Sequence, residues 1–279
     1  MITLEQLTDE VRDLAPLPAA AAKLAQLAAD MDADTQLIVD TIRYDQALTA
    51  RVLRYANSPA AGSYYRIRSV KDAVVRLGLG KLLELAISAH VSGQMQTALP
   101  EYGLGEIDLW RHSVASATAA DLLTRQRSNS VPPESFSAAL LHDIGKLVLA
   151  RHLDPPSQES IKKFTDEYSM TYYQAELEVL GFTHASIGSS IAKRWSLDET
   201  ICSAIGHHHD VDADHGSIND IVQIGNVVAK TIGFGLGHEG LNLAANAAAC
   251  ERLDISRDEF EGLCAETSGL MNSIDEFYA

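Results

Sequence analysis

Residues 45–59 read DQALTARVLRYANSP, and their pattern decides the class of fold. Asp45 belongs to the residue types that cap helix N-termini with a side-chain oxygen. Leu48 and Val52 begin an apolar series that recurs at the three- and four-residue spacing of one helix face. Pro59 closes an Asn-Ser-Pro triplet that does not continue a helix. The stretch therefore predicts a helix that begins after Asp45 and ends before Pro59.

The same helical signals recur on both sides of this stretch, and alternating strand patterns are nearly absent. We expect further helices at residues 18–29, 35–42, 70–77, 80–96, 106–127, 157–169, 171–180, 183–195, 198–209, 217–231 and 254–275. Pro132 and Pro133 are expected to open a further helix that runs through Leu141, and Pro155 and Pro156 to separate it from the helix at residues 157–169. Residues 97–106, TALPEYGLGE, contain proline and glycine and are typical of a joint. We predict an all-α fold with two helical lobes, residues 1–100 and 101–279.

The composition is that of a folded globular protein, with 279 residues, 46% of them hydrophobic and 22% charged. The 38 Asp and Glu outnumber the 22 Lys and Arg, which gives a net charge of −16 with neutral histidine. This charge argues against nucleic acids and anionic membranes as partners, because both require clustered cations. The three cysteines lack a CxxC spacing, and no apolar run reaches the length of a membrane span. We expect a cytoplasmic protein that is not secreted.

Residues 141–146, LHDIGK, carry the strongest local sign of chemistry. His142 and Asp143 offer a nitrogen and an oxygen ligand side by side, which one divalent metal can take together. Lys146 follows one helical turn after His142, where its ammonium could meet a phosphate oxygen. An isolated His-Asp pair is also common as a surface ion pair. The positions of the other histidines are therefore needed to distinguish a metal site from such a pair. The chain has 10 histidines, three of them in succession at residues 207–209.

The order of these histidines resembles the ligand order of the HD superfamily of metal phosphohydrolases. The matching residues are His112, His142, Asp143, His184, His208 and His209. Their spacing is similar to that of the HD-GYP branch, in which an aspartate on a later helix ends the series. Asn226 stands at that place here, and the GYP signature after the histidines is missing. An amide oxygen is a neutral ligand that cannot bridge two cations as a carboxylate does.

The N-terminal half resembles the HDOD domain family. The matching stretches are LAPLP at residues 14–18, DQALTARVLRYANSP at 45–59 and IRSVKDAVVRLG at 67–78. With the His-Asp segment, the resemblance covers roughly residues 14–235. It implies an all-helical output module of bacterial signalling. Members of this family frequently lack the metal ligands, whereas this chain keeps six of the seven positions.

The resemblance also implies roles for individual residues. The implied metal ligands are His112, His142, Asp143, His184, His208, His209 and Asn226. Asp143 is implied to bridge two ions and Lys146 to stabilise developing charge, which makes these two the expected catalytic residues. Because imidazoles dominate the set, we expect one or two transition-metal ions, Fe or Mn before Zn or Ni. Glu176 could approach a metal, but a solvated position on a helix face is the favoured interpretation.

Three functions are compatible with these residues. The first is a signal-transduction module with a metal site, whose partner is a signalling protein or a small phosphorylated ligand. The second is a metal-dependent phosphohydrolase, and the third is a di-iron oxygenase, for which the sequence offers no specific feature. No catalytic role is expected before residue 105. The glycine-rich residues 233–240, GFGLGHEG, follow a predicted helix, so we do not expect a dinucleotide site there.

Overall fold

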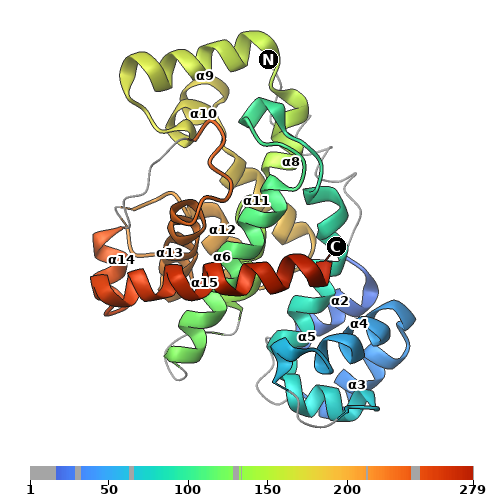
Figure 1. Cartoon of the computed structure of the whole chain (residues 1–279). Coiled ribbons are helices and arrows are strands. Elements are labelled where there is room, and N and C mark those ends of the chain that lie inside the picture. The colour runs from blue at the N-terminus through green and yellow to red at the C-terminus, as the bar shows by residue number, and fades with distance from the viewer. Residues whose placement is uncertain are drawn as a thin grey trace. The chain divides into compact units, whose positions relative to one another are not determined.

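The computed structural model describes residues 17–28, 33–62, 66–127, 132, 134–211, 213–239 and 246–278 (Figure 1). Their regular secondary structure is helical without any strand, apart from an isolated antiparallel bridge between Leu99 and Leu104. The prediction of an all-α fold is therefore confirmed. None of the helices in these ranges is long and apolar enough to cross a bilayer. All three cysteines are free.

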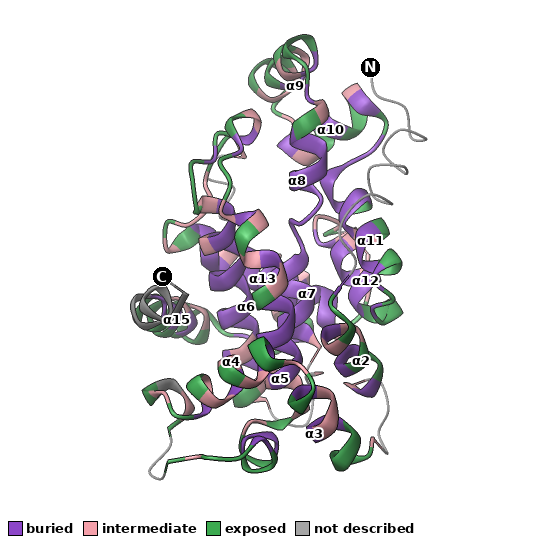
Figure 2. Cartoon of the chain, turned by 90° about the vertical axis from the view of Figure 1, so that its right-hand side faces the viewer, coloured by how far each residue is buried: buried purple, intermediate pink, exposed green. Residues whose placement is uncertain are grey.

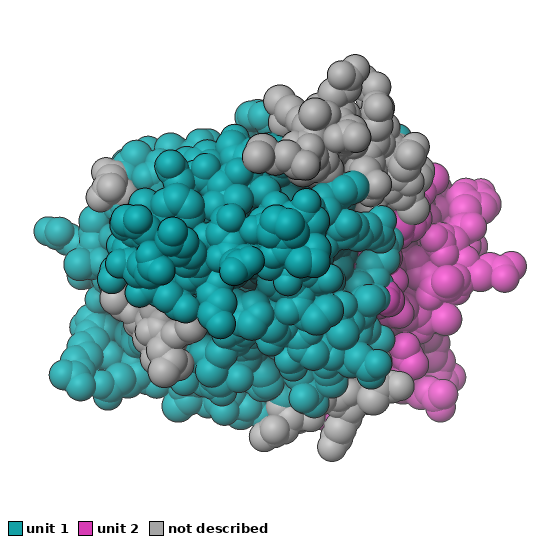
Figure 3. All heavy atoms as spheres, turned by 90° about the horizontal axis from the view of Figure 1, so that it is seen from above, with its two compact units in different colours: residues 1–15, 94–194, 199–279 teal, residues 16–93, 195–198 magenta. Residues whose placement is uncertain are grey.

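The described residues divide into two compact units, which Figure 3 shows in different colours. Unit 2 comprises residues up to Gly93 together with Trp195–Asp198, and unit 1 comprises the rest from Gln94 onward. The chain passes from unit 2 to unit 1 a few residues before the expected joint at residues 97–106. No sequence pattern predicts that residues 195–198 belong to unit 2.

Unit 2 begins with α2 (Ala19–Ala28), α3 (Thr35–Arg43) and α4 (Gln46–Ala56), and α3 packs against both of its neighbours. Both α3 and α4 are capped, because Asp34 accepts the N–H of Gln36 and Asp45, the expected cap, accepts the N–H of Leu48. The 3-10 turn η1 (Pro59–Ala61) follows α4. The helix predicted from residues 45–59 is thus confirmed, together with its start and its end.

The long helix α5 (Val70–Met95) contains a break at the expected place. Gly78 has φ 74° and ψ 164°, which is outside the helical region and is easily adopted by glycine. The expected helices at residues 70–77 and 80–96 are therefore two segments on either side of this glycine.

Unit 1 contains the remaining helices of the described chain. They are α6 (Asp108–Gln126), α7 (Ser135–Leu141), α8 (Lys146–Leu149), α9 (Pro155–Tyr168), α10 (Tyr172–Leu180), α11 (His184–Arg194), α12 (Glu199–His207), α13 (Ser217–Thr231), α14 (Ala247–Arg252) and α15 (Arg257–Tyr278), with the 3-10 turns η2 (Pro100–Tyr102) and η3 (Ala150–His152). The short helices α8 and α14 were not predicted. The helix boundary expected at Pro155 and Pro156 is present, but both prolines belong to the first turn of α9 behind the cap Asp154, where proline is tolerated, so this helix begins two residues earlier than predicted.

The core of unit 1 is built around α6, which packs against α7, α13 and α15. Figure 2 shows α6, α7 and α13 as largely buried ribbons. The middle of α6 is rich in Ala, Ser and Thr, and these small side chains allow close approach of the neighbouring helices. A Cβ on Gly225 of α13 would lie 2.6 Å from the Ser116 carbonyl oxygen of α6. The contact between α6 and α13 therefore requires glycine at this position.

A second close contact joins the His-Asp segment to α11. A Cβ on Gly145 would lie 2.0 Å from the carbonyl oxygen of His184, and Gly188 on α11 faces the same segment. α8, which follows Gly145, packs against α11. Glycine in the LHDIGK segment thus allows the first turn of α11 to lie directly against His142 and Asp143.

Replacement of Gly145 by alanine tests this contact. We expect Gly145→Ala to lower the free energy of unfolding by about 2 kcal/mol or more, because backbone atoms of α11 must shift. Gly269→Ala on α15, where nothing lies within 4 Å of the new Cβ, is the matched control. It should stabilise the protein by up to about 1 kcal/mol through helix propensity. Equal effects of the two substitutions in chemical denaturation would contradict the contact.

Candidate metal centre

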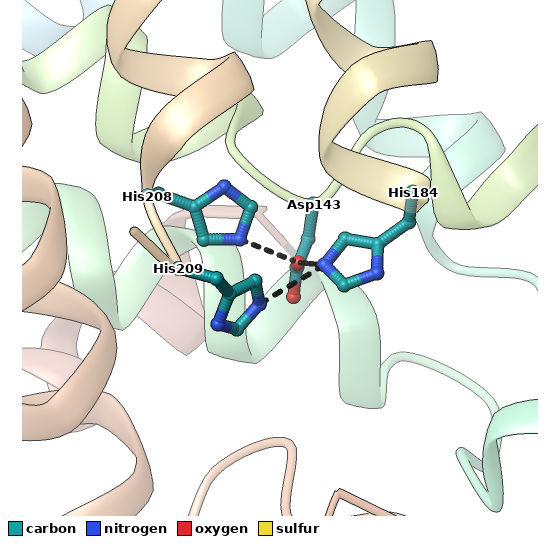
Figure 4. Close-up of side chains that lie close together, drawn as sticks. All are labelled: Asp143, His184, His208 and His209. Atoms are coloured by element: carbon teal, nitrogen blue, oxygen red, sulfur yellow. Dashed lines mark hydrogen bonds and ion pairs between the residues drawn. The ribbon is translucent and has the colours of Figure 1, made fainter. Parts of the chain in front are cut away.

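Two groups of potential metal ligands meet at one carboxylate, that of Asp143. One group consists of His112, His142 and Asp143, and the other of Asp143, His184, His208 and His209. Within each group, the ligand atoms lie within 4.8 Å of one another. Figure 4 shows the second group, with its three imidazoles around the Asp143 side chain. The structure thus brings together six of the seven residues implied as ligands.

The two carboxylate oxygens of Asp143 face different groups. Oδ2 lies 3.4 Å from His142 Nε2 and 3.5 Å from His112 Nε2. Oδ1 lies 3.4 Å from His184 Nε2 and 3.6 Å from His208 Nε2. Asp143 is 2% exposed, and its Oδ1 has no hydrogen-bond partner. This is the arrangement of a carboxylate that can serve two cation sites.

Backbone carbonyls fix the orientation of three of the imidazoles. The acceptors of Nδ1 are Phe234 O for His112 at 3.1 Å, Ala139 O for His142 at 2.7 Å and Ile205 O for His208 at 2.7 Å. A carbonyl oxygen only accepts, so each Nδ1 carries the proton and each Nε2 presents a lone pair toward Asp143. This is the tautomer that metal-ligating histidines adopt.

The orientation of His184 depends on a carboxylate. Glu176 on α10 is fully buried, and its Oε2 lies 2.8 Å from both Nδ1 and the backbone N of His184. Its Oε1 accepts the Tyr102 hydroxyl at 2.8 Å. The solvated position expected for Glu176 is wrong, because three donors, the Tyr102 hydroxyl and the Nδ1 and backbone N of His184, hold its carboxylate inside unit 1. Tyr102 lies before residue 105 and acts through Glu176 rather than on a ligand atom.

The charge states of the histidines follow from burial and from these carboxylates. Burial lowers the pKa of His112 to about 4, although Asp143 acts in the opposite direction. Burial likewise lowers the pKa of His142, His208 and His209. Burial alone would also lower the pKa of His184, but the adjacent Glu176 outweighs it and raises that pKa. Near neutral pH, His112 and His142 are therefore uncharged.

A cation fits between His112 and His142. Their Nε2 atoms lie 3.2 Å apart, and both present lone pairs because both Nδ1 protons are bonded to carbonyls. Two facing lone pairs repel each other unless a cation lies between or beside them. Since both rings are neutral near neutral pH and neither Nε2 carries a proton, a metal ion would satisfy this arrangement. On the other side of Asp143, His184 Nε2 and His209 Nε2 lie 3.1 Å apart.

Lys146 is not free to meet a ligand in the way the sequence suggested. Its Nζ donates to Asp143 Oδ2 at 2.8 Å and forms an ion pair with Glu239. The second oxygen of Glu239 accepts Lys230 Nζ at 2.6 Å. Burial opposes ionisation of Glu239, but the two ammoniums hold its pKa well below the usual value. Glu239 and Lys230 were not predicted, because a carboxylate after a glycine-rich stretch and a lysine on a helix carry no specific signal.

The glycine-rich stretch before Glu239 is packed tightly on the centre. A Cβ on Gly235 would lie 2.6 Å from His112 Cβ, and one on Gly237 would lie 2.3 Å from the Tyr102 carbonyl oxygen. His238 N–H donates to the same carbonyl at 2.7 Å. All three glycines at positions 233, 235 and 237 have positive φ. The role of this stretch is therefore to lie against His112 and to carry Glu239 to Lys146.

A cavity of about 690 Å³ adjoins the second ligand group. Its walls include His208, His209, Lys230 and Glu239. Asn226 also lines it, and the Asn226 Oδ1 is buried without a hydrogen-bond partner. The cavity has the volume of a small-molecule site. That Asn226 ligates a metal stays a prediction, because no contact joins it to either ligand group.

Comparison with known proteins identifies the family. The chain belongs to the HDOD domain family, whose model matches residues 14–211. It is 28% identical to an HDOD domain protein of unknown function from Geobacter sulfurreducens, with a TM-score of 0.68 and coverage of 99% of this chain and 97% of that one. The match to a protein of Marinobacter aquaeolei VT8, described provisionally as a signal transduction protein, has 24% identity, a TM-score of 0.75 and coverage of 98% and 60%.

Two further matches complete the comparison. A protein of Shewanella amazonensis SB2B, described provisionally as a metal-dependent phosphohydrolase, is 20% identical with a TM-score of 0.61, and the match covers 99% of this chain and 96% of that one. At such identities these structures share the fold. An uncharacterised protein of Treponema pallidum (strain Nichols) is 24% identical over 206 residues, which are 74% of this chain and 39% of that protein. The chain thus matches well under half the length of this relative.

The low pKa of His112 predicts a pH dependence of the metal-free protein. The unfolded chain takes up a proton near pH 6.5, and folded His112 does so only near pH 4. The stability from neutral His112 is therefore complete above pH 6.5 and is lost as the pH falls to 4, by about 3 kcal/mol. Denaturant unfolding of chelated protein should show a weaker pH dependence for His112→Gln than for His207→Gln, whose ring lies outside both groups. Identical slopes would contradict the assignment.

Glu176→Gln tests the contact that orients His184. Removal of the charge should weaken metal binding by about 10–100-fold, the usual effect of losing a carboxylate behind a metal-ligating histidine. Glu178→Gln, an exposed position on the same helix, should leave the affinity unchanged. Competition with a chelating indicator measures both constants. A Glu176→Gln affinity equal to that of wild type would show that the contact does not act on the metal.

Proposed function

We propose that this member of the HDOD domain family is a signal-transduction module whose metal centre recognises a small phosphorylated ligand. The observation that carries the proposal is the pair of facing lone pairs on His112 and His142 beside the shared carboxylate of Asp143. Such an arrangement has no structural purpose in a metal-free helical core. The likeness to proteins described as signal transduction proteins and metal-dependent phosphohydrolases supports the same interpretation.

The donor set determines which metal fits. Five imidazoles and one carboxylate are a set that suits Fe or Mn, with Zn or Ni as alternatives, better than Mg. His112, His142 and Asp143 would hold one ion, and Asp143 with His184, His208 and His209 would hold a second. A bound divalent ion would supply Lewis-acid attraction for an anionic oxygen of the ligand. Two divalent ions would carry more charge than the single carboxylate of Asp143 neutralises, which favours an anion in the cavity.

The surroundings of the centre favour recognition over hydrolysis. Lys146, the expected stabiliser of developing charge, is held by the carboxylates of Asp143 and Glu239. Asn226 supplies an amide where related phosphodiesterases have a carboxylate. In a module of this kind, binding of the ligand in the cavity would change the interaction with a signalling protein.

Hydrolysis of a phosphate ester at the same centre is the second candidate. One observation favours it: the cavity reaches His208 and His209, so a ligand could lie directly beside the second ligand group. Asp143 would then be the residue without which turnover stops.

Metal and ligand binding by Asp143 variants tests the proposal. Wild-type protein should contain or take up Fe, Mn, Zn or Ni in elemental analysis. Asp143→Ala should lose it, because Asp143 belongs to both ligand groups. The matched control His207→Ala should keep the metal. A wild-type protein that takes up none of these metals would contradict the proposal.

The same samples separate the two candidate functions. Metal-loaded wild type is incubated with cyclic dinucleotides, nucleotides and an aryl phosphate, and both binding and product are measured. The signalling module predicts metal-dependent binding without turnover. Turnover that disappears in Asp143→Ala would instead establish the phosphohydrolase.

A further inference from the structure

Glu239 lies between two buried lysines at the wall of the cavity. Its Oε1 pairs with Lys146 of α8, and its Oε2 accepts Lys230 Nζ of α13 at 2.6 Å. The side chains of Lys146, Lys230 and Glu239 are 3%, 6% and 9% exposed, respectively. The Glu239 carboxylate thus pairs with two ammonium groups that are almost fully buried.

Two ammoniums held in this way can bind two oxygen atoms of one ligand group, as they bind those of Glu239. A phosphate group presents such a pair of oxygens and carries more negative charge than a carboxylate. Lys146 already has a second counter-ion in Asp143, whereas Lys230 pairs with Glu239. Removal of the Glu239 carboxylate would leave two buried ammoniums with only one carboxylate, which is strongly unfavourable. An external oxyanion would relieve this.

The exchange of anions requires little movement. Glu239 and Lys230 both line the cavity that also reaches His208 and His209, so an anion in the cavity meets them directly. The main chain before Glu239 is held by the packing of Gly235 on His112 and of Gly237 on Tyr102. Rotation of the Glu239 side chain about its own bonds, without movement of this main chain, would free both lysines.

We propose that Glu239 is an internal counter-anion that occupies a phosphate site, and that a phosphate group entering from the cavity replaces it between Lys146 and Lys230. This deepens the proposed function, on which it rests, by naming where the phosphate of the ligand binds. Glu239 competes with the ligand and so sets the concentration at which the cavity fills. The phosphate can belong to a small organic molecule or be inorganic phosphate.

Titration of chelated protein with inorganic phosphate tests the exchange directly. Glu239→Gln should bind phosphate at least tenfold more tightly than wild type in calorimetry, because the competing charge is gone. Glu261→Gln, an exposed glutamate paired with Arg257 on α15, removes the same charge elsewhere and should bind as wild type does. The double variant Glu239→Gln/Lys230→Met should lose the gain. Unchanged or weaker binding by Glu239→Gln overturns the proposal.

Thermal unfolding provides a second readout. Glu239→Gln should melt below wild type in chloride buffer, and phosphate should restore most of the difference, whereas chloride at equal ionic strength should not. If this variant does not fold in chloride, recovery of folded protein in phosphate supports the exchange. Absence of recovery, or equal recovery in chloride, shows a purely structural ion pair and overturns it.

Two further comparisons distinguish an organic phosphate from free phosphate, and the anion exchange from the proposed function. Tighter binding of a nucleoside monophosphate than of inorganic phosphate to Glu239→Gln supports an organic ligand, and the reverse supports free phosphate. No gain for either probe overturns the exchange. Because these titrations use chelated protein, their outcome does not depend on the metal. Failure of the proposed function appears instead as absent metal uptake by wild type.

Discussion

The opposition of two imidazole lone pairs, on His112 Nε2 and His142 Nε2 at 3.2 Å, is the interaction on which the rest of the site depends. Each ring is fixed by a hydrogen bond from Nδ1 to a backbone carbonyl, so neither can turn its proton toward the other. Burial keeps both rings neutral near pH 7. A cation bound here would make this part of the core favourable, and the Asp143 carboxylate would complete its ligand set.

The helices of unit 1 are arranged so that the potential metal ligands meet at the Asp143 carboxylate. α6 supplies His112, the end of α7 supplies His142 and Asp143, and the first turn of α11 supplies His184. Such close approach is possible because glycines face backbone atoms, as Gly145 does at the His184 carbonyl and Gly225 at the Ser116 carbonyl. The small side chains and glycines of the core thus have a functional consequence: they bring ligands from separate helices within reach of one carboxylate.

The sequence predicted the helices well where local chemistry determines them. The caps Asp34 and Asp45 and the break at Gly78 act within a few residues, so their effect is visible in the sequence. The start of α9 was predicted two residues late, because proline in the first helical turn and proline in a linker have the same local pattern. The ligand order also identified the histidines and Asp143 as one cluster, since it depends on type and spacing.

The contacts that support the cluster could not be predicted in this way. Tyr102 and Glu176 are 74 residues apart and meet only through tertiary packing. Glu239 follows a glycine-rich stretch to which the sequence assigned no role, whereas the structure uses its glycines for close contact with His112 and Tyr102. Buried charges such as Lys146 and Glu239 are recognised only once the partner is in place, because each alone has the pattern of a surface residue.

X-ray absorption spectroscopy of metal-loaded protein tests the central claim most directly, because it reports the atoms bound to the metal. The account predicts a first shell dominated by imidazole nitrogens, with a minor contribution from carboxylate oxygen. It also predicts that His112→Ala or His142→Ala reduces the imidazole signal. A shell of oxygen or sulfur without imidazole scattering would contradict the account.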